Sequence, residues 1–304
     1  MQRADANSIS VDGVSADSGI GTAARHWLGG GMPPFTSIGS MHGLVSTDAL
    51  EEFRIETGGS RADTGPLPGG QLTLSTRAGT NQLHGSVYEF LRNSSLDAND
   101  WFANSTGQAR PLLQLSDFGA TLGGPIRRDR TFFFASFEGL RLRQSSIEEE
   151  TVPDAAARSA APSGLRPWLL ALPNGQSIGM GEASVTEIAP VRSEVNTAGL
   201  RLDHAFSSRL QLFSRYQHAP SFTHQVLLGG LQREDLDTAS DSWTAGLDAA
   251  ITHAIQNHLR VNYSRNQSGN SGGQFRRGGE HLTFYPIRQY RRPPLKRTIR
   301  SRST

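Results

Sequence analysis

The sequence contains no cysteine. A disulfide framework, a thiolate metal site and a cysteine nucleophile are therefore excluded. No stretch approaches the roughly 20 apolar residues that a transmembrane helix needs, which excludes a helical membrane protein. It does not exclude a membrane β-barrel, because barrel strands alternate between apolar and polar residues and give only a weak hydropathy signal.

Lysine is almost absent, since Lys296 is the only one. Residues 276–304 carry a net charge of +8 and the rest of the chain −6, so the basic balance comes from the tail. Alternation of apolar and polar residues is lost from about Phe275. We interpret residues 276–304 as a disordered or frameshifted tail. The alternative is a segment that holds nucleic acid or anionic lipid by charge.

Residues 1–81 predict short strands separated by turns. Ile9, Val11 and Val14 suit a strand around an Asp12-Gly13 turn. A helical turn is expected over 48–52, followed by strands over 53–57 and 71–77. In the last of these, Leu72 and Leu74 face the same side.

Longer strands are predicted over residues 82–275. The segments 83–92, 117–126 and 131–143 have the length of a tilted transmembrane strand, about 9–11 residues. Two hairpins follow, around Ser207-Ser208 and between Ile251 and Leu259. Residues 144–192 interrupt the pattern with five prolines, and we expect a long loop there, with short helices over 154–161 and 165–172.

Alternation within the hairpins predicts two unlike faces. The face that we expect toward lipid holds Leu200, Leu202, Leu210, Leu212, Leu247, Ile251, Leu259 and Val261. The opposite face, expected toward the lumen, holds Arg201, Asp203, Arg209, Gln211, Asp248 and Arg260. A soluble β-sandwich would show the same alternation. Strand length, long loops and strand-end aromatics such as Tyr216 and Tyr263 favour a membrane barrel.

Several short motifs follow one another in a fixed order between residues 47 and 143. They are Asp48-Ala49-Leu50-Glu51-Glu52-Phe53, the run from Gly69 to Asn81, His84-Gly85-Ser86, Tyr88-Glu89-Phe90-Leu91-Arg92-Asn93, Leu96-Asp97-Ala98, Trp101-Phe102, Phe118-Gly119, Leu122-Gly123-Gly124-Pro125-Ile126, Asp129-Arg130-Thr131-Phe132-Phe133-Phe134 and Phe137-Glu138-Gly139-Leu140-Arg141. This stretch resembles the junction of plug and barrel in TonB-dependent receptors, and is most similar to the Oar-like branch. The three phenylalanines are expected where a strand enters the lipid boundary.

The resemblance implies a plug domain inside a barrel of about 22 strands, which imports a ligand with energy from the TonB system. It implies plug residues at 1–81, barrel strands at 82–275, outer-membrane lipid and a TonB-type energy-coupling complex as partners, and an outer-membrane location. The sequence shows no TonB box, no signal peptide in residues 1–7, and about seven or eight barrel strands. We therefore expect an internal fragment of a longer protein, with an unknown ligand.

No catalytic, cofactor-binding or metal-ligating residue is predicted. The histidines weighed as metal ligands lack metal-site spacing: His204, His218, His224, His253 and His258. His84 belongs to the junction motif, and residues 148–150 suit a solvated acidic run. Ser86 and Ser136 lack a nucleophile elbow, and residues 29–31 lack the Lys-Ser/Thr of a phosphate loop.

The sequence therefore predicts a mainly β fold, with part of a plug followed by an incomplete antiparallel transmembrane barrel. The expected function is ligand uptake across the outer membrane by a TonB-dependent, Oar-like transporter, and not enzymatic catalysis. Two alternatives stay open. One is a structural or adhesive surface β protein that does not transport, and the other is a soluble nucleic-acid-binding protein that acts through its basic tail, although no nucleic-acid partner is expected.

Overall fold

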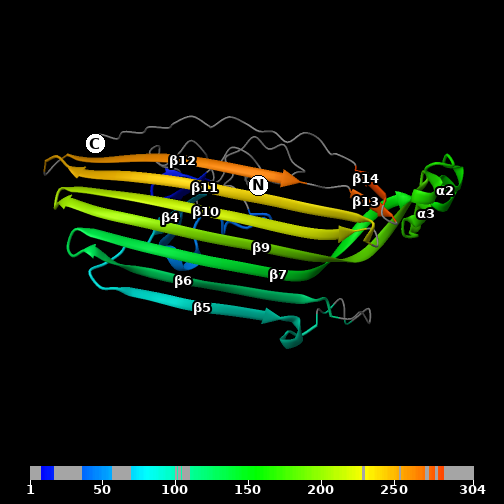
Figure 1. The fold of residues 1–304 in the computed structure, drawn as a ribbon, viewed down its shortest axis with the longest axis horizontal. Coiled ribbons are helices and arrows are strands. Elements are labelled where there is room, and N and C mark those ends of the chain that lie inside the picture. The colour runs from blue at the N-terminus through cyan, green and yellow to red at the C-terminus, as the bar shows by residue number, and fades with distance from the viewer. Residues whose placement is uncertain are drawn as a thin grey trace.

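The fold consists of two β-sheets of unequal size (Figure 1). The computed structural model describes residues 8–16, 36–56, 70–99, 101, 104, 110–227, 230–252, 255–270, 274–277 and 280–283. Antiparallel strands dominate, so the prediction of a mainly β fold with an open, partial barrel is confirmed. Within the described residues, the helices are too short or too polar to cross a membrane.

The large sheet is an antiparallel meander in which each long strand pairs with the next one along the chain. Its long strands, called the wall below, are β5 (His84–Asn93), β6 (Leu113–Arg127), β7 (Thr131–Pro153), β9 (Glu182–Ser207), β10 (Leu210–Leu227), β11 (Gln232–Ala250) and β12 (Gln256–Asn270). Short strands β8 (Gln176–Gly179), β13 (Gln274–Arg277) and β14 (Glu280–Thr283) extend it. One edge of the sheet is β5.

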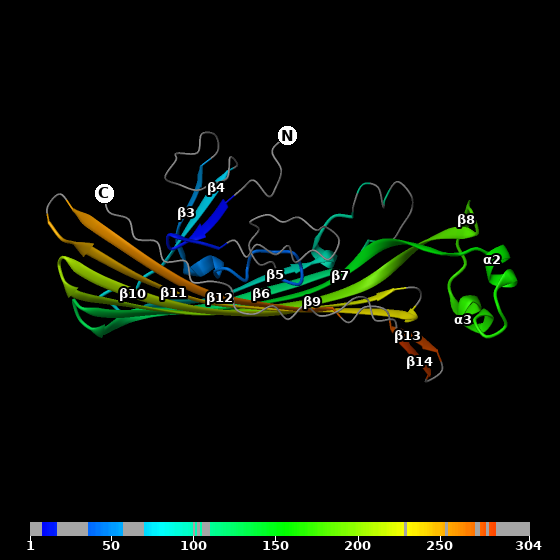
Figure 2. The same cartoon turned by 90° about the horizontal axis from the view of Figure 1, so that it is seen from above.

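The small sheet has the order β2-β1-β4-β3 and lies against one face of the wall (Figure 2). It consists of β1 (Ser8–Val11), β2 (Val14–Ser15), β3 (Leu50–Glu56) and β4 (Gln71–Thr76), with a 3-10 turn η2 (Thr47–Ala49) before β3. The Asp12-Gly13 turn has positive φ at both residues, which suits the tight turn between β1 and β2. Val11 and Leu74 form its core with Phe134 from the wall.

The predicted separation of apolar and charged residues onto two opposite faces is confirmed for the residues that lie in strands. Leu212, Leu247 and Leu259 are directly paired across β10, β11 and β12 and so share a face. Phe213 pairs with Asp203, and Arg215 with Arg201, on the opposite face. The small sheet contacts this second face, which we call the inner face. Arg209 and Ile251 lie in turns, outside the strands.

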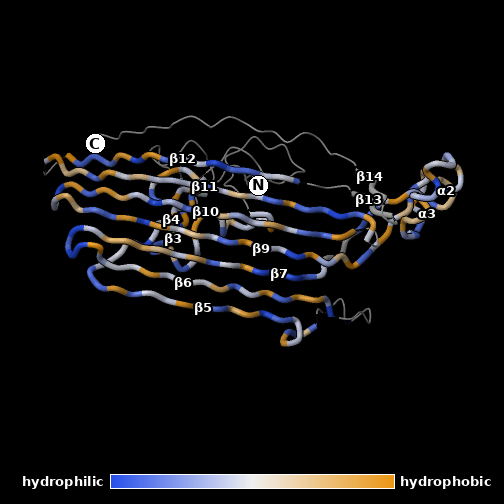
Figure 3. The backbone as a smooth tube through the Cα atoms, in the orientation of Figure 1, coloured by the Kyte–Doolittle hydropathy of each residue, from blue (hydrophilic) through white to orange (hydrophobic). Residues whose placement is uncertain are grey.

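A row of aromatic residues bounds the apolar part of the outer face. Tyr216, Trp243 and Tyr263 are paired side by side and are 42–51% exposed. Two residues farther along the same strands, away from the leucines, the same face carries a row of His218, Asp241 and Arg265. In Figure 3, β12 accordingly alternates between apolar and polar residues in its first part and is polar in the rest. This arrangement is typical of a strand that leaves lipid at an aromatic girdle.

Substituting Leu247 by arginine is expected to lower the free energy of unfolding by about 2–4 kcal/mol, because a charge then sits in the lipid-facing band. Ala239→Arg is the matched control, since Ala239 lies on the same strand and face but beyond Trp243. Its expected effect is under about 1 kcal/mol. Urea unfolding of the chain in lipid vesicles measures both values. Equal losses would contradict the assignment of the lipid-facing band.

The prediction of a loop over residues 144–192 is wrong at both ends of this range, which belong to strands. Strand β7 continues to Pro153 and β9 begins at Glu182, and their pairing is unbroken through this region. Backbone pairing in a long hairpin needs no apolar alternation, so the pattern did not reveal it. The two predicted helices are confirmed as α2 (Ala155–Ala160) and α3 (Arg166–Ala171).

The three consecutive phenylalanines do not form one lipid-facing group. Phe133 pairs with Leu202 on the outer face, whereas Phe134 pairs with Arg201 on the inner face and is only 4% exposed. Adjacent residues in a strand point to opposite sides, and the small sheet covers the inner one. The expectation of a lipid boundary at Phe134 is therefore wrong. Of the predicted tail, only residues 276–277 and 280–283 are among the described residues.

Arg158 holds together the far end of the long hairpin, where α2 and α3 lie (Figure 2). Its guanidinium donates to the carbonyls of Pro153, Leu172 and Pro173 and to Asn174 Oδ1. The residue is 3% exposed. One charged side chain therefore satisfies acceptors from both sides of the helical pair.

Arg158→Ala is expected to destabilise this end by about 2–3 kcal/mol, because several buried acceptors lose a charged donor. Limited proteolysis should then cut between residues 154 and 181 at a lower protease concentration. Arg166→Ala is the control: Arg166 is exposed and, within the described residues, bonds two carbonyls. If both variants are cut alike, Arg158 does not organise the tip.

Candidate functional site

The functional site that the structure favours is the polar interface between the small sheet and the inner face of the wall. Asp12 lies at its centre. The carboxylate accepts hydrogen bonds from the backbone N and Oγ1 of Thr76. Arg201 Nη1 lies 3.5 Å from Oδ1, and Arg215 Nε lies 3.0 Å from Oδ2 at an angle that makes no hydrogen bond. A turn of the small sheet thus places one anion between two wall cations.

These cations are oriented by the wall itself. Arg201 also pairs with Asp203 at 2.8 Å and donates to the carbonyl of Thr76. Its guanidinium lies over the Phe213 ring, 4.7 Å from the centroid, and Arg260 lies over the same ring at 5.1 Å. The ring can lie there because residue 246 is glycine, since a Cβ at Gly246 would collide with it. The inner face thus presents fixed positive charge to the small sheet.

Glu138 forms a second anchor. This wall residue is 2% exposed, and its Oε2 accepts hydrogen bonds from Ser46 Oγ at 2.7 Å, Thr47 N at 3.0 Å and Tyr88 OH at 3.1 Å. Tyr88 reaches it by lying across Gly119, where any side chain would collide with the ring. A buried wall carboxylate therefore fixes the segment that leads into η2.

A third anchor joins residues 36–44 to β9 and β10. Ser221 Oγ accepts from Ser37 N at 2.8 Å, and Thr223 Oγ1 donates to Ser37 Oγ at 2.9 Å. Farther along, Thr197 Oγ1 donates to the His42 carbonyl at 2.9 Å. Apart from the packing of Phe134, the contacts of the Asp12, Glu138 and Ser37 anchors between residues 8–76, called the small part below, and the wall are hydrogen bonds and ion pairs. Such contacts can be exchanged for water one at a time.

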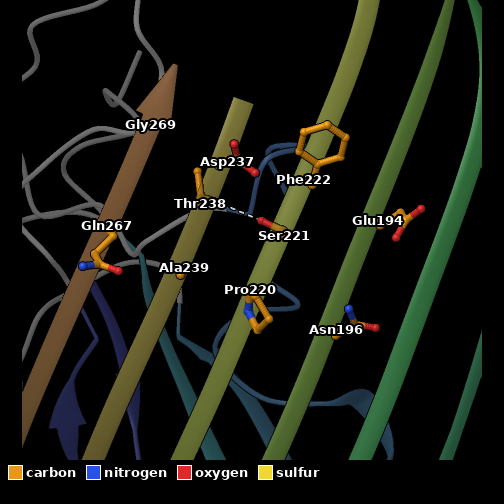
Figure 4. A pocket seen from close by; sticks show the side chains of 10 residues that line it. All are labelled: Glu194, Asn196, Pro220, Ser221, Phe222, Asp237, Thr238, Ala239, Gln267 and Gly269. Atoms are coloured by element: carbon orange, nitrogen blue, oxygen red, sulfur yellow. Dashed lines mark hydrogen bonds between the residues drawn. The ribbon is translucent and has the colours of Figure 1, made fainter. Parts of the chain in front are cut away.

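The outer face carries a shallow hollow of about 320 Å³, on the opposite side of the wall from the third anchor (Figure 4). Pro220 and Phe222 lie beside Glu194 and Asp237, while Ser221 and Thr238 point to the other side and bond each other. Its acidic rim lies beyond the aromatic row. The hollow therefore belongs to the polar part of the outer surface.

Four of the histidines weighed from the sequence each have a polar partner on an adjacent strand. His218, His224 and His258 pair with Asp241, Asp235 and Asp248, and His204 bonds Thr131. None of the four joins a wider group of potential metal ligands among the described residues. His84 bonds the Gln82 carbonyl, Ser86 bonds Thr121, and Ser136 is buried in the wall. His253, residues 29–31 and the Glu148 side chain lie outside the described residues.

Comparison with known proteins gives a match to the family described as outer membrane beta barrel domain over residues 75–170. The matched residues include strands β5, β6 and β7 of the wall. The chain is also 36% identical over 97 residues to the TonB-dependent transporter Oar of Myxococcus xanthus, which confirms the predicted resemblance to Oar-like TonB-dependent receptors over that stretch. These residues are 31% of this chain and 9% of the transporter, so the chain spans a small part of its relative.

Solved structures similar to this chain include BauA, the ferric preacinetobactin receptor of Acinetobacter baumannii, and Fiu, the ferric-catecholate import receptor of E. coli K12. Both are 12% identical with a TM-score of 0.43. The similarity covers 82% of this chain and 41% of BauA, and 88% of this chain and 43% of Fiu.

Proposed function

We propose that this chain forms the place where plug meets barrel in an Oar-like TonB-dependent transporter that takes up a ligand across the outer membrane. Residues 1–81 form the end of the plug and 82–275 the first barrel strands. Outer-membrane lipid and a TonB-type energy-coupling complex are its partners. The supporting observation is that the small sheet binds the inner face through buried charges, whereas the opposite face carries the apolar band.

This arrangement suits a plug that must be held and later displaced. The Asp12, Glu138 and Ser37 anchors are polar, and each lies on a different part of the inner face. A polar contact can be replaced by water as the plug moves, whereas a large apolar contact would expose surface at about 25 cal/mol per Å². Displacement of the small sheet from the wall is therefore the proposed opening step.

A disulfide lock tests this proposal, because the chain has no cysteine of its own. Ser37 and Thr223 have side-chain oxygens 2.9 Å apart, so Ser37→Cys with Thr223→Cys can tie the small part to β10. The pair is placed in a chimaera that carries residues 8–270 in the Oar transporter. We expect the chimaera to show TonB-dependent transport. Oxidation should abolish this transport, and a reductant should restore it. Each single cysteine variant is the control.

The outcomes separate two claims. A chimaera that reaches the outer membrane but shows no TonB-dependent transport would refute the transport function and leave the barrel assignment intact. Insensitivity of a working chimaera to the lock would refute displacement of the small sheet.

A structural or adhesive surface role is the second candidate. The observation that favours it is the long β7–β9 hairpin, which carries α2 and α3 far beyond the rest of the wall (Figure 1). Deleting residues 154–181 distinguishes the two functions. Adhesion should be lost and uptake retained if the hairpin acts in surface contact.

A further inference from the structure

Three potential metal ligands from different parts of the fold converge beside the Glu138 anchor. His42 comes from the segment before η2, Asp117 from β6 and Glu138 from β7. One ligand atom of each lies within 4.8 Å of the others. This group could not be recognised from the sequence, because its members share no spacing along the chain.

The contacts within this group are incomplete without a further ligand. Glu138 uses Oε2 for its three hydrogen bonds, while Oε1 lies 3.9 Å from His42 Nε2. That distance is too long for a hydrogen bond. Two donors on one tetrahedral Zn²⁺, each at about 2.0–2.2 Å, lie about 3.4 Å apart. The separation is about 0.5 Å wider than this, so a small shift of the His42 side chain would bring both atoms to the distances of two ligands of one ion.

Two buried atoms of the group also lack partners. Among the residues that the structure describes, His42 Nδ1 and Asp117 Oδ1 are buried with no hydrogen-bond partner. A buried polar atom without a partner costs about 1–3 kcal/mol. Such atoms are rare and call for an explanation. An ion at the centre of the group would give Asp117 Oδ1 a partner, but it would bind His42 through Nε2, the ring nitrogen that faces Glu138, and so does not account for Nδ1.

We propose that His42, Asp117 and Glu138 bind a divalent first-row transition-metal ion that clips the small sheet to the wall. One imidazole with two carboxylates suits Zn²⁺ and similar ions. Ca²⁺ is disfavoured because it takes six to eight oxygen ligands. The clip joins a residue of the small part to two residues of the wall, so bound metal resists separation of the two. It requires no transport activity and does not depend on the proposed function.

The test measures Zn²⁺ binding to the full 304-residue chain in detergent micelles, without a polyhistidine tag. Isothermal titration should give one equivalent, and Co²⁺ should give a visible ligand-field spectrum without thiolate bands, because the chain has no cysteine. His42→Ala and Asp117→Asn should each weaken binding at least about tenfold. The matched control is His218→Ala, which removes a histidine paired with one aspartate outside the group.

Circular dichroism and protease resistance of each variant show whether it is folded. His42→Gln, which keeps a polar side chain of similar size, replaces any variant that is not. No stoichiometric binding, equal binding by folded His42 variants, or displacement of Zn²⁺ by an equal concentration of Ca²⁺ would each overturn the proposal. Loss of binding in His218→Ala would move the site elsewhere and overturn it as well.

Discussion

Replacing Asp12 by alanine is expected to lower the free energy of unfolding of the docked small sheet by about 3–5 kcal/mol. The carboxylate is 5% exposed and faces Arg201 and Arg215, whose side chains are 17% and 6% exposed. Its removal leaves two positive charges close together in a buried place, and Thr76 loses its acceptor. We expect the small sheet to separate from the wall before the wall itself unfolds.

Urea unfolding in detergent, followed by protease digestion of the small part, measures this effect. Glu56→Ala is the control, because Glu56 pairs with Arg54 in the same sheet at 2.7 Å while both side chains are about half exposed or more. An exposed pair contributes about 0–1 kcal/mol. Similar losses in both variants would show that Asp12 is not the anchor.

Glu138→Ala is expected to cost about 3–5 kcal/mol, since Ser46, Thr47 and Tyr88 lose the same buried acceptor at once. Tyr88→Phe removes one donor and should cost only about 1 kcal/mol. Both values are measured with a metal chelator present, so that ion binding does not contribute.

Glu89→Ala is the matched control for this experiment. Glu89 is on β5 next to Tyr88, is exposed on the outer face and accepts one bond from Ser116. Its loss should change stability by less than about 1 kcal/mol. A small effect of Glu138→Ala, comparable with that of Glu89→Ala, would contradict the anchoring role.

Local pattern predicted much of the wall. A two-residue period is a property of the strand backbone, so Leu212 and Arg215 could be assigned to opposite faces before any pairing was known. The Asp12-Gly13 turn was also predictable, because its positive φ angles suit these two residues.

The strand ends and the site were not predictable in the same way. Strand β7 extends ten residues beyond the predicted end at Arg143 because β9 pairs with it, and pairing is a property of two segments. Asp12 could be recognised as a turn residue, but its burial depends on the distant Arg215. His42 had no local signal, because Asp117 and Glu138 reach it only in the folded chain.

The pairing order of the wall also has a consequence for how the chain folds. Each long strand pairs with its neighbour in sequence, so hairpins can add one after another, most of them with short loop closures. The contact between Ser37 and Ser221 instead spans 184 residues. Docking of the small sheet therefore has to wait until β10 is in place, and until then the arginines of the inner face remain hydrated. The N-terminal part of the chain is thus synthesised first but docks onto the wall last. Because its contacts span the largest sequence separation, we expect docking to be the slowest step of assembly.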